Sequence, residues 1–367
     1  MAIDKIESAG LATNTNQPGL RNIMINGDMS IAQRSTSVSS ITGSGYNTVD
    51  RIHLLLNSLG TWTQSQSTTV PTGQGFATSL KMDNTTADAS PSSGDYCIVR
   101  TKFEGQMLQY LKKGTSSAES TTLSFWVRSN KTGTYIAELY DADNTRNISK
   151  SYTISSADTW EKKTITYDGD TTGALDNNNA LSLSINFWLG AGTDYTSGTL
   201  ATSWASATNA NRAVGQVNLA DSTSNEWYIT GLQLEAGTAA SDFEFLPHDV
   251  NLQRCYRYCY RINGNTTDEQ QIGGYGFCTS STNVNVSYTF HPPLRSVPSV
   301  SESNCKETFQ GVNVSQYAIF DNDQPNLCNT LGLSFQPDSG SPFTSSDIAA
   351  VRLHNSASAF IMFDAEL

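Results

Sequence analysis

The chain lacks most of the residue patterns that mark enzymes. Its four histidines are scattered, and no nucleophile elbow, HExxH motif or phosphate-binding loop occurs. The carboxylate pairs that a glycosidase could use, Asp141 with Asp143 and Asp168 with Asp170, lie in turn-like segments rich in Asp, Gly and Asn. We therefore expect turn or surface roles for these pairs and no enzymatic activity.

Charge and long apolar runs are also scarce. Charged residues make up 15% of the chain and the net charge is −12. Since no dense Lys/Arg run offsets this negative charge, a nucleic-acid backbone would be repelled, and we expect no nucleic-acid partner. No run approaches the ~18 apolar residues that a membrane-spanning helix needs. Residues 1–10 lack the apolar core of a signal peptide, so we expect neither membrane insertion nor secretory export.

Cysteine is present, but not in a pattern that identifies a site. None of the six cysteines forms a CxxC motif, which argues against the commonest zinc and redox arrangements. Cys255 and Cys259 are spaced i, i+4, and a metal pair at that spacing would need further ligands. Buried free thiols are the favoured interpretation, and disulfides or a metal site are the alternatives. The cysteines are Cys97, Cys255, Cys259, Cys278, Cys305 and Cys328.

What the sequence does contain is a long succession of short strand patterns. Aromatic and branched residues fill segments 123–128, 135–140 and 160–167, and turn residues bound them. In segment 181–189, Leu, Ile and Phe alternate with Ser, Asn and Trp, which predicts a strand with one face in a core. Because no helical pattern interrupts these strands, we predict an all-β protein with a jelly-roll-like β-sandwich over residues 21–248.

The rest of the chain predicts three further parts. Residues 1–20 are polar, contain glycine and proline, and read as an extended arm that attaches to another chain. A connecting helix is expected in segment 249–264, with Asp249 as N-cap. Its stripe of Leu252, Tyr256 and Tyr260 is expected to form a buried interface or hinge. Residues 265–367 resume the β pattern and predict a smaller C-terminal β-domain. Its expected strands are 284–290, 317–320, 331–335, 350–353 and 360–363.

Several of these segments are similar to known proteins. The closing strand Trp227–Gly237 (WYITGLQLEAG), the exit segment Phe243–Pro247 (FEFLP) and the Tyr/Arg-rich Asn251–Tyr260 follow one another. Together with Asn22–Arg34 and Tyr46–Arg51 near the start, they resemble the two ends of the carbohydrate-binding-module-like jelly roll found in bacteriophage tail fibres and related virion proteins. The first and last strands of that module would pair.

The resemblance implies a function and a place. It implies a structural component of a tailed-phage virion, assembled in the host cytoplasm, that acts as a short trimeric fibre or receptor-binding protein engaging a host surface glycan. Its partners would be two further copies in a homotrimer, and other virion proteins through the arm. The alternatives are a capsid decoration or head-fibre protein, and a non-viral carbohydrate-binding module that accompanies an enzyme.

We expect two candidate sites in the larger domain, one for a carbohydrate and one for a structural calcium ion. Carbohydrate sites use exposed aromatic faces to stack on sugar rings, and Trp188 and Trp204 are the candidates. Trp188 alternates with Ser and Asn, so it should point away from the main core; the alternative is a second core or a subunit interface. The resemblance also suggests a structural calcium site at Asp28 and Glu235. The chain departs from that pattern at Thr230-Gly231, where an acidic pair would be expected.

Overall fold

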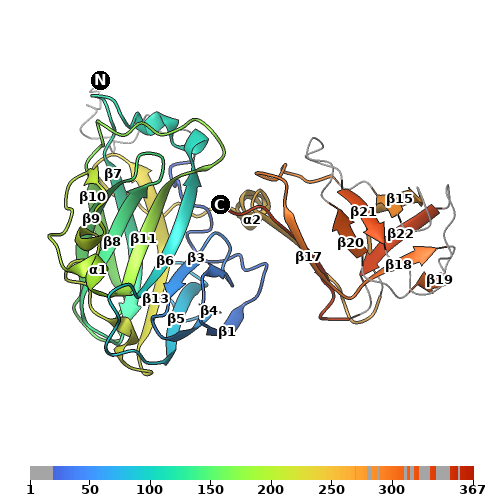
Figure 1. Cartoon of the computed structure of the whole chain (residues 1–367), viewed down its shortest axis with the longest axis horizontal. Coiled ribbons are helices and arrows are strands. Elements are labelled where there is room, and N and C mark those ends of the chain that lie inside the picture. The colour runs from blue at the N-terminus through green and yellow to red at the C-terminus, as the bar shows by residue number, and fades with distance from the viewer. Residues whose placement is uncertain are drawn as a thin grey trace, which may run out of the picture. The chain divides into compact units, whose positions relative to one another are not determined.

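A computed structural model of the protein describes most of the chain and divides it into two units, at the boundary between Asn251 and Leu252 (Figure 1). Leu367 belongs to the first unit. The predicted arm, residues 1–20, lies outside the described residues except for Leu20. The described residues are 20–268, 270–278, 283–286, 289–309, 312–314, 318–321, 331–335, 348–353 and 356–367.

The first unit is a sandwich of two antiparallel sheets. The first sheet has the strand order β1 (Ser37–Ile41), β4 (Thr61–Ser67), β5 (Ser79–Thr86), β13 (Glu226–Ala236), β7 (Thr121–Ser129) and β10 (Glu161–Tyr167). The second sheet has the order β12 (Ala205–Ser206), β9 (Arg146–Ile154), β8 (Gly133–Asp141), β11 (Leu181–Ala191), β6 (Tyr96–Glu104), β3 (His53–Asn57) and β2 (Gly45–Tyr46). The predicted all-β fold and β-sandwich are confirmed.

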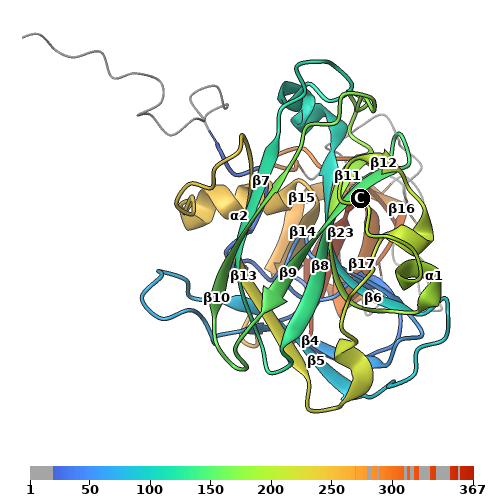
Figure 2. The same cartoon turned by 90° about the vertical axis from the view of Figure 1, so that its left-hand side faces the viewer.

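The core of the sandwich lies between the inner faces of these sheets. Leu123, Phe125 and Val127 alternate along β7 and enter this core. Leu183, Ile185 and Phe187 do the same from β11 in the second sheet. Burial of each such side chain contributes ~1.5–3 kcal/mol, so the alternation seen in the sequence selects the face on which each strand packs. Figure 2 shows the long paired strands β8 and β9 of the second sheet side by side.

The outer face of the second sheet is also covered. Ser182, Ser184, Asn186 and Trp188 of β11 are as buried as the residues that face the main core. Segment 191–213, which includes α1 (Thr193–Thr196) and η3 (Asn209–Asn211), supplies apolar side chains over this face. Both faces of β11 are therefore buried, because a long connection between strands covers the outer one.

The N-terminal segment Asn22–Arg34 is not the strand that the resemblance implied. It lies along β13, where the Ile23 amide donates to the Leu234 carbonyl and the Leu232 amide donates to the Gly27 carbonyl, both at 2.9 Å. Asn26 and Met29 have positive φ angles of 61° and 59°, which interrupt a regular ladder. The two ends of the module are thus adjacent, as expected, without forming a regular strand pair.

The second unit contains two further sheets. One has the order β14 (Cys259–Asn263), β23 (Phe360–Asp364) and β17 (Ser299–Ser303). The other has the order β19 (Val312–Val314), β18 (Cys305–Phe309), β22 (Ile348–Leu353), β15 (Gln270–Cys278), β16 (Asn283–Val286), β21 (Leu331–Phe335) and β20 (Ala318–Asp321). Each predicted C-terminal strand coincides at least in part with one of these. Parts of segments 284–290 and 317–320 lie outside the described residues.

The predicted connecting helix is shorter than expected. Helix α2 (His248–Tyr256) ends before Tyr260, which lies in β14 opposite Phe363. Leu252, Tyr256 and Tyr260 are each only half-buried, whereas Cys255, Tyr258 and Cys259 are buried. The prediction that these three residues form one buried stripe of a helix is therefore wrong. Alternating residues Tyr258, Tyr260 and Ile262 favour a strand, and pairing with β23 stabilises it.

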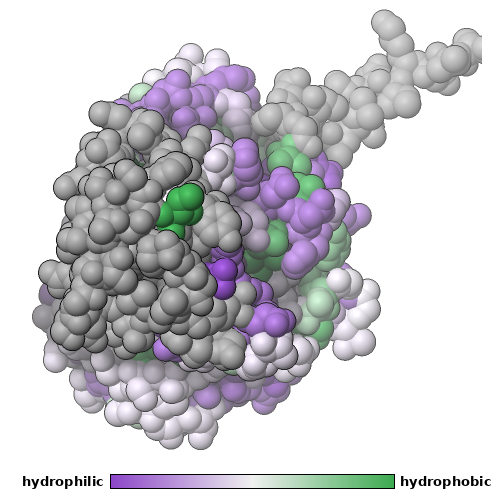
Figure 3. Space-filling view, turned by 90° about the vertical axis from the view of Figure 1, so that its right-hand side faces the viewer, coloured by the Kyte–Doolittle hydropathy of each residue, from purple (hydrophilic) through white to green (hydrophobic). Residues whose placement is uncertain are grey.

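Short helices complete the described chain. They are η1 (Gly105–Met107), η2 (Gln109–Leu111) and η4 (Leu219–Asp221). Among the described residues, no helix has the length and apolar character needed to cross a membrane. On the face shown in Figure 3, the coloured residues are mostly purple or white with scattered green ones, in keeping with the polar composition.

Candidate functional site

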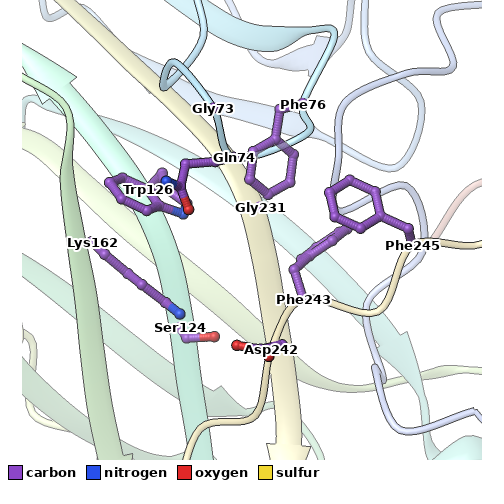
Figure 4. A pocket seen from close by; sticks show the side chains of 10 residues that line it. All are labelled: Gly73, Gln74, Phe76, Ser124, Trp126, Lys162, Gly231, Asp242, Phe243 and Phe245. Carbon is purple, nitrogen blue, oxygen red and sulfur yellow. The ribbon is translucent and has the colours of Figure 1, made fainter.

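A groove lies on the outer face of the first sheet. Because Leu123, Phe125 and Val127 point into the core, the alternate residues Ser124 and Trp126 of β7 point outward. Trp126 is half-buried and forms one wall, and Lys162 of β10 pairs directly with it across the strands. The groove encloses about 240 Å³ (Figure 4). Its lining residues are Gly73, Gln74, Phe76, Ser124, Trp126, Lys162, Gly231, Asp242, Phe243 and Phe245.

A glycine in β13 makes room for the floor of the groove. Gly231 has φ +61° and stands where the pairing register with β7 shifts between Thr230 and Gln233. A Cβ at this position would lie 2.6 Å from Cζ of the Phe76 ring. Any side chain here would displace Phe76, and the left-handed backbone would be strained as well. The departure at Thr230-Gly231 from the implied acidic pair therefore has a structural reason in this chain.

Three phenylalanines form an aromatic cup at one end of the groove. Phe76, Phe243 and Phe245 have ring centroids 4.8–5.1 Å apart. Phe76 is buried, while Phe245 at the rim is 49% exposed. The Phe245 ring lies against Gly75, whose φ of +82° allows the loop to approach closely. An exposed phenylalanine beside two packed ones gives the groove an exposed apolar surface.

The opposite end of the groove is polar. Figure 4 shows the Lys162 amine, Ser124 and the Asp242 carboxylate gathered on one side, away from Phe76. Lys162 and Asp242 are exposed, and within the described part of the chain neither side chain takes part in an ion pair. Gln74 adds an amide at the loop. A cation, a carboxylate, a hydroxyl and an amide are thus available to a ligand.

A buried network holds the loop that carries Asp242 and Phe243. Gln233 accepts a hydrogen bond from the Glu244 amide at 2.8 Å and donates to the Asp242 carbonyl at 3.3 Å. Glu235 accepts from the Ser241 amide and from the Ser241 hydroxyl, both at 2.7 Å. These two buried side chains of β13 therefore fix the position of one wall of the groove.

The residues predicted to share a calcium ion lie in different networks. Asp28 accepts from Ser30 Oγ at 3.0 Å and from Asn251 Nδ2 at 3.1 Å. Glu235 is surrounded by donors, including Gln233 Nε2 at 2.6 Å. Calcium requires several oxygen ligands, so the donor set around Glu235 does not fit the ion. Among the described side chains, no group of three His, Cys, Asp or Glu residues could hold a metal.

Trp188 is not an exposed stacking surface. It does point away from the main core, but it is 0% exposed and packs with Ile98, Ile136 and Ala213. Its Nε1 donates to Glu138 Oε2 at 3.3 Å, and Glu138 also binds Arg212 Nε at 2.8 Å. The alternative interpretation, a residue of a second core, is the one that the structure shows. Neither face of this ring is available to a sugar.

Trp204 closes a buried charge cluster. Its Nε1 donates to the Asp168 carbonyl at 2.7 Å, and the Lys113 ammonium lies 3.9 Å from the ring centroid. Lys113 binds Asp170 at 3.1 Å, and Arg146 binds the same carboxylate at 2.7 Å. Burial alone would raise the pKa of Asp170, but the hydrogen bonds and these cations hold it at about 2. The half-buried Trp204 thus has one face occupied, and it does not line the groove.

The three cysteines whose side chains the structure describes are free thiols. Cys97 is a buried free thiol, and burial raises its pKa well above the ordinary range. Cys255 and Cys259 are buried, but they lie on different elements, one in α2 and the other in β14. The spacing that suggested a helical metal pair is therefore not realised. The side chains of Cys278, Cys305 and Cys328 lie outside the described part of the structure.

Sequence reasoning did not identify the residues of the groove. The outward position of Trp126 could have been inferred, because it alternates with Leu123, Phe125 and Val127. Phe243 and Phe245 were visible as an aromatic pair after the closing strand. Nothing in the sequence around Phe76 shows that it reaches β13. Only the strand order β5–β13–β7 brings these segments together.

Comparison with known proteins finds distant structural likenesses. No family model and no curated protein matches the chain. The enzymatically active domain of tailspike protein 4 from bacteriophage CBA120 aligns with 15% identity and a TM-score of 0.30, over 59% of this chain and 21% of that one. A putative sugar-binding protein from Bacteroides thetaiotaomicron aligns with 12% identity and a TM-score of 0.31, over 59% of this chain and 100% of that one.

A third solved structure is TmCBM61 in complex with β-1,4-galactotriose. It aligns with 10% identity and a TM-score of 0.29, over 59% of this chain and 99% of that one. Likeness at this level assigns neither a ligand nor an activity to the chain.

Proposed function

We propose that the protein binds a carbohydrate in the groove on the outer face of its first sheet, without cleaving it. The observation that carries this proposal is that Trp126 and the aromatic cup line the same groove as the polar side chains of Lys162, Asp242 and Gln74. Sugar rings present apolar C–H faces that stack on aromatic rings, and hydroxyls that hydrogen-bond to charged and amide side chains. The groove offers both kinds of partner within one open depression.

The setting in which the protein acts is the second part of the proposal. We place this carbohydrate-binding sandwich in the virion of a tailed phage, as a homotrimeric short fibre or receptor-binding protein that engages a host surface glycan. The support is the likeness of segments Asn22–Arg34 and Trp227–Gly237 to the corresponding ends of virion jelly rolls. Capsid decoration is the rival setting, because the same modules are used there. Residues 1–20 would attach the chain to other virion proteins in either case.

Replacement of Trp126 tests the carbohydrate site. Loss of an aromatic stacking partner costs ~0.5–1.5 kcal/mol, so Trp126→Ala should weaken binding to lipopolysaccharide or capsular polysaccharide of a susceptible host by about twofold to thirteenfold. Biolayer interferometry with immobilised polysaccharide would measure this. Lys162→Ala should also weaken binding, whereas Lys163→Ala, on the neighbouring residue of β10, should not. Trp204→Ala serves as the matched tryptophan control outside the groove.

The outcomes separate the parts of the proposal. Equal binding by the Trp126 and Trp204 variants would refute the groove as the site. Release of reducing ends from the polysaccharide would refute the absence of catalysis. Antibody labelling of purified particles in the electron microscope should mark the tail; labelling of the head would favour capsid decoration, and unlabelled particles would refute the virion setting.

A further inference from the structure

The groove combines an apolar pocket with a polar end, and this combination restricts the class of sugar. We infer that its ligand is an N-acetylated amino sugar, with the pyranose ring on Trp126, the acetyl methyl in the aromatic cup of Phe76, Phe243 and Phe245, and the amide N–H directed to Asp242. This inference rests on the proposed carbohydrate-binding function. It adds to that function the chemical group that the site selects.

The aromatic cup calls for an apolar substituent. Phe245 is 49% exposed at the rim, beside the packed rings of Phe76 and Phe243. A plain hexose carries hydroxyls around its ring, and placing one of these against three phenyl rings would remove its water without a replacement hydrogen bond. A methyl group instead gains from leaving water there. The ligand therefore carries at least one methyl group.

The polar end distinguishes an acetamido group from other methyl-bearing groups. The Asp242 carboxylate accepts hydrogen bonds only, and the Lys162 ammonium donates only. An acetamido group has one N–H donor for the first and one carbonyl acceptor for the second, or for the Gln74 amide. A 6-deoxy sugar also supplies a methyl group, and its hydroxyls can bind Asp242 and Lys162, but only an acetamido group carries the methyl, the donor and the acceptor on one substituent, as the adjacent apolar and polar ends of the groove require. A free amino sugar supplies a donor but leaves the cup without a methyl and adds a positive charge near Lys162.

Charge balance and size agree with this class. Lys162 and Asp242 lie in the same groove with opposite charges, so a neutral ligand with a donor and an acceptor matches them better than a sugar acid would. A volume of about 240 Å³ is below the ~300–1,000 Å³ of clefts that bury drug-sized ligands. The groove therefore suits a single sugar unit, at a chain end or along a chain that leaves through the open side.

Matched sugar pairs test the inference with the full-length protein. Saturation-transfer NMR and competition titration would compare N-acetylglucosamine and N-acetylgalactosamine with glucose, galactose, glucosamine, galactosamine, rhamnose and fucose. We expect at least tenfold tighter binding of each N-acetylated sugar than of its hydroxyl counterpart, with the strongest saturation on the acetyl methyl. Phe245→Ser, a change at an exposed rim position, should reduce this preference to less than threefold while the protein stays folded.

The possible failures are distinguishable. Equal binding of acetylated and non-acetylated sugars would overturn the inference and leave the carbohydrate site standing, as would a preference for rhamnose or fucose. An unchanged acetyl preference in Phe245→Ser would also overturn it, because the methyl would then bind elsewhere. Absence of Trp126-dependent binding to any of these sugars and to host polysaccharide would overturn the proposed function together with the inference.

Discussion

Replacement of Trp188 by alanine tests whether the outer face of the second sheet is a packed second core. The side chain is 0% exposed and contacts a cluster made by Ile98, Ile136 and Ala213, and its ring lies 5.3 Å from that of Tyr195. If Trp188 were the exposed ligand-binding residue that its polar neighbours in sequence suggested, alanine would leave stability almost unchanged. The structure predicts the opposite.

The magnitude follows from the packing. Truncation of a fully buried tryptophan or phenylalanine costs ~3–5 kcal/mol, and in a domain of 150–250 residues each kcal/mol lowers Tm by ~2–4 °C. Trp188→Ala should therefore lower the Tm of the sandwich by about 6–20 °C. Trp188→Phe keeps most of the apolar contact and loses the hydrogen bond to Glu138, which is 3.3 Å long. That variant should lose only ~1–2 kcal/mol, near the lower end for hydrogen bonds to charged groups.

Tryptophan fluorescence is a suitable assay, because it reports the sandwich alone. The six tryptophans of the chain lie between residues 62 and 227, all within the first unit. Urea unfolding of Trp188→Ala, Trp188→Phe and the groove variant Trp126→Ala would give three free energies. We expect the largest loss for Trp188→Ala and a clearly smaller one for Trp126→Ala, whose ring is half-exposed. A Trp188→Ala protein within about 1 kcal/mol of the wild type would refute the second core.

Two further predictions concern pH and assembly. Burial, with the charges of Lys102 and Arg100 next, lowers the pKa of His53 from 6.5 to about 3. Between these values the unfolded chain binds a proton that the folded chain does not, so the free energy of unfolding should fall as pH drops, by at most ~1.4 kcal/mol per pH unit from this group. Urea titrations between pH 6 and 4 should show a flatter slope for His53→Gln, and identical slopes would show that His53 is protonated in the folded state. For assembly, multi-angle light scattering of the full chain at micromolar concentration should give the mass of about three chains, and the mass of a single chain would contradict the proposed trimer. Removal of residues 1–20 should leave the unfolding of the sandwich, followed by tryptophan fluorescence, unchanged.

Much of the sandwich could be predicted because its strands are marked locally. Alternation in β7 and β11, with turn residues between strands, identified both elements and the residues that enter the main core. Alternation also placed Trp188 on the outer face of β11, but it could not decide between an exposed residue and a second core, because the cover comes from a distant segment. Segment 191–213 buries Trp188, and Glu138 with Arg212 supplies its polar partners. The alternation of serine and asparagine with core residues therefore shows on which face of the strand Trp188 lies, but it does not show whether that face is exposed to solvent.

The helix was predicted too long for a similar reason. Segment 249–260 contains residues at helical spacing and also alternating tyrosines, so both patterns fit locally. Residues Cys259–Asn263 form strand β14 because they pair with β23, which lies near the C-terminal end of the sequence, so the helix ends at Tyr256. The helix pattern alone could not reveal this partner, and Tyr258 is the buried tyrosine instead of Tyr256.

The groove shows most clearly what local patterns cannot supply. Its floor depends on a register shift in β13 at Gly231, its cup on two loops that meet over that glycine, and its polar end on a cross-strand pair of β7 and β10. Glu235, first interpreted as a calcium ligand, instead holds the Ser241 end of the loop that carries Asp242 and Phe243. A buried carboxylate with donors on both oxygens fixes a loop more rigidly than an exposed one would. Glu235, which the resemblance implied as a calcium ligand, and Gly231, at the place where the chain departs from that pattern, therefore hold and shape a wall of the groove in this chain.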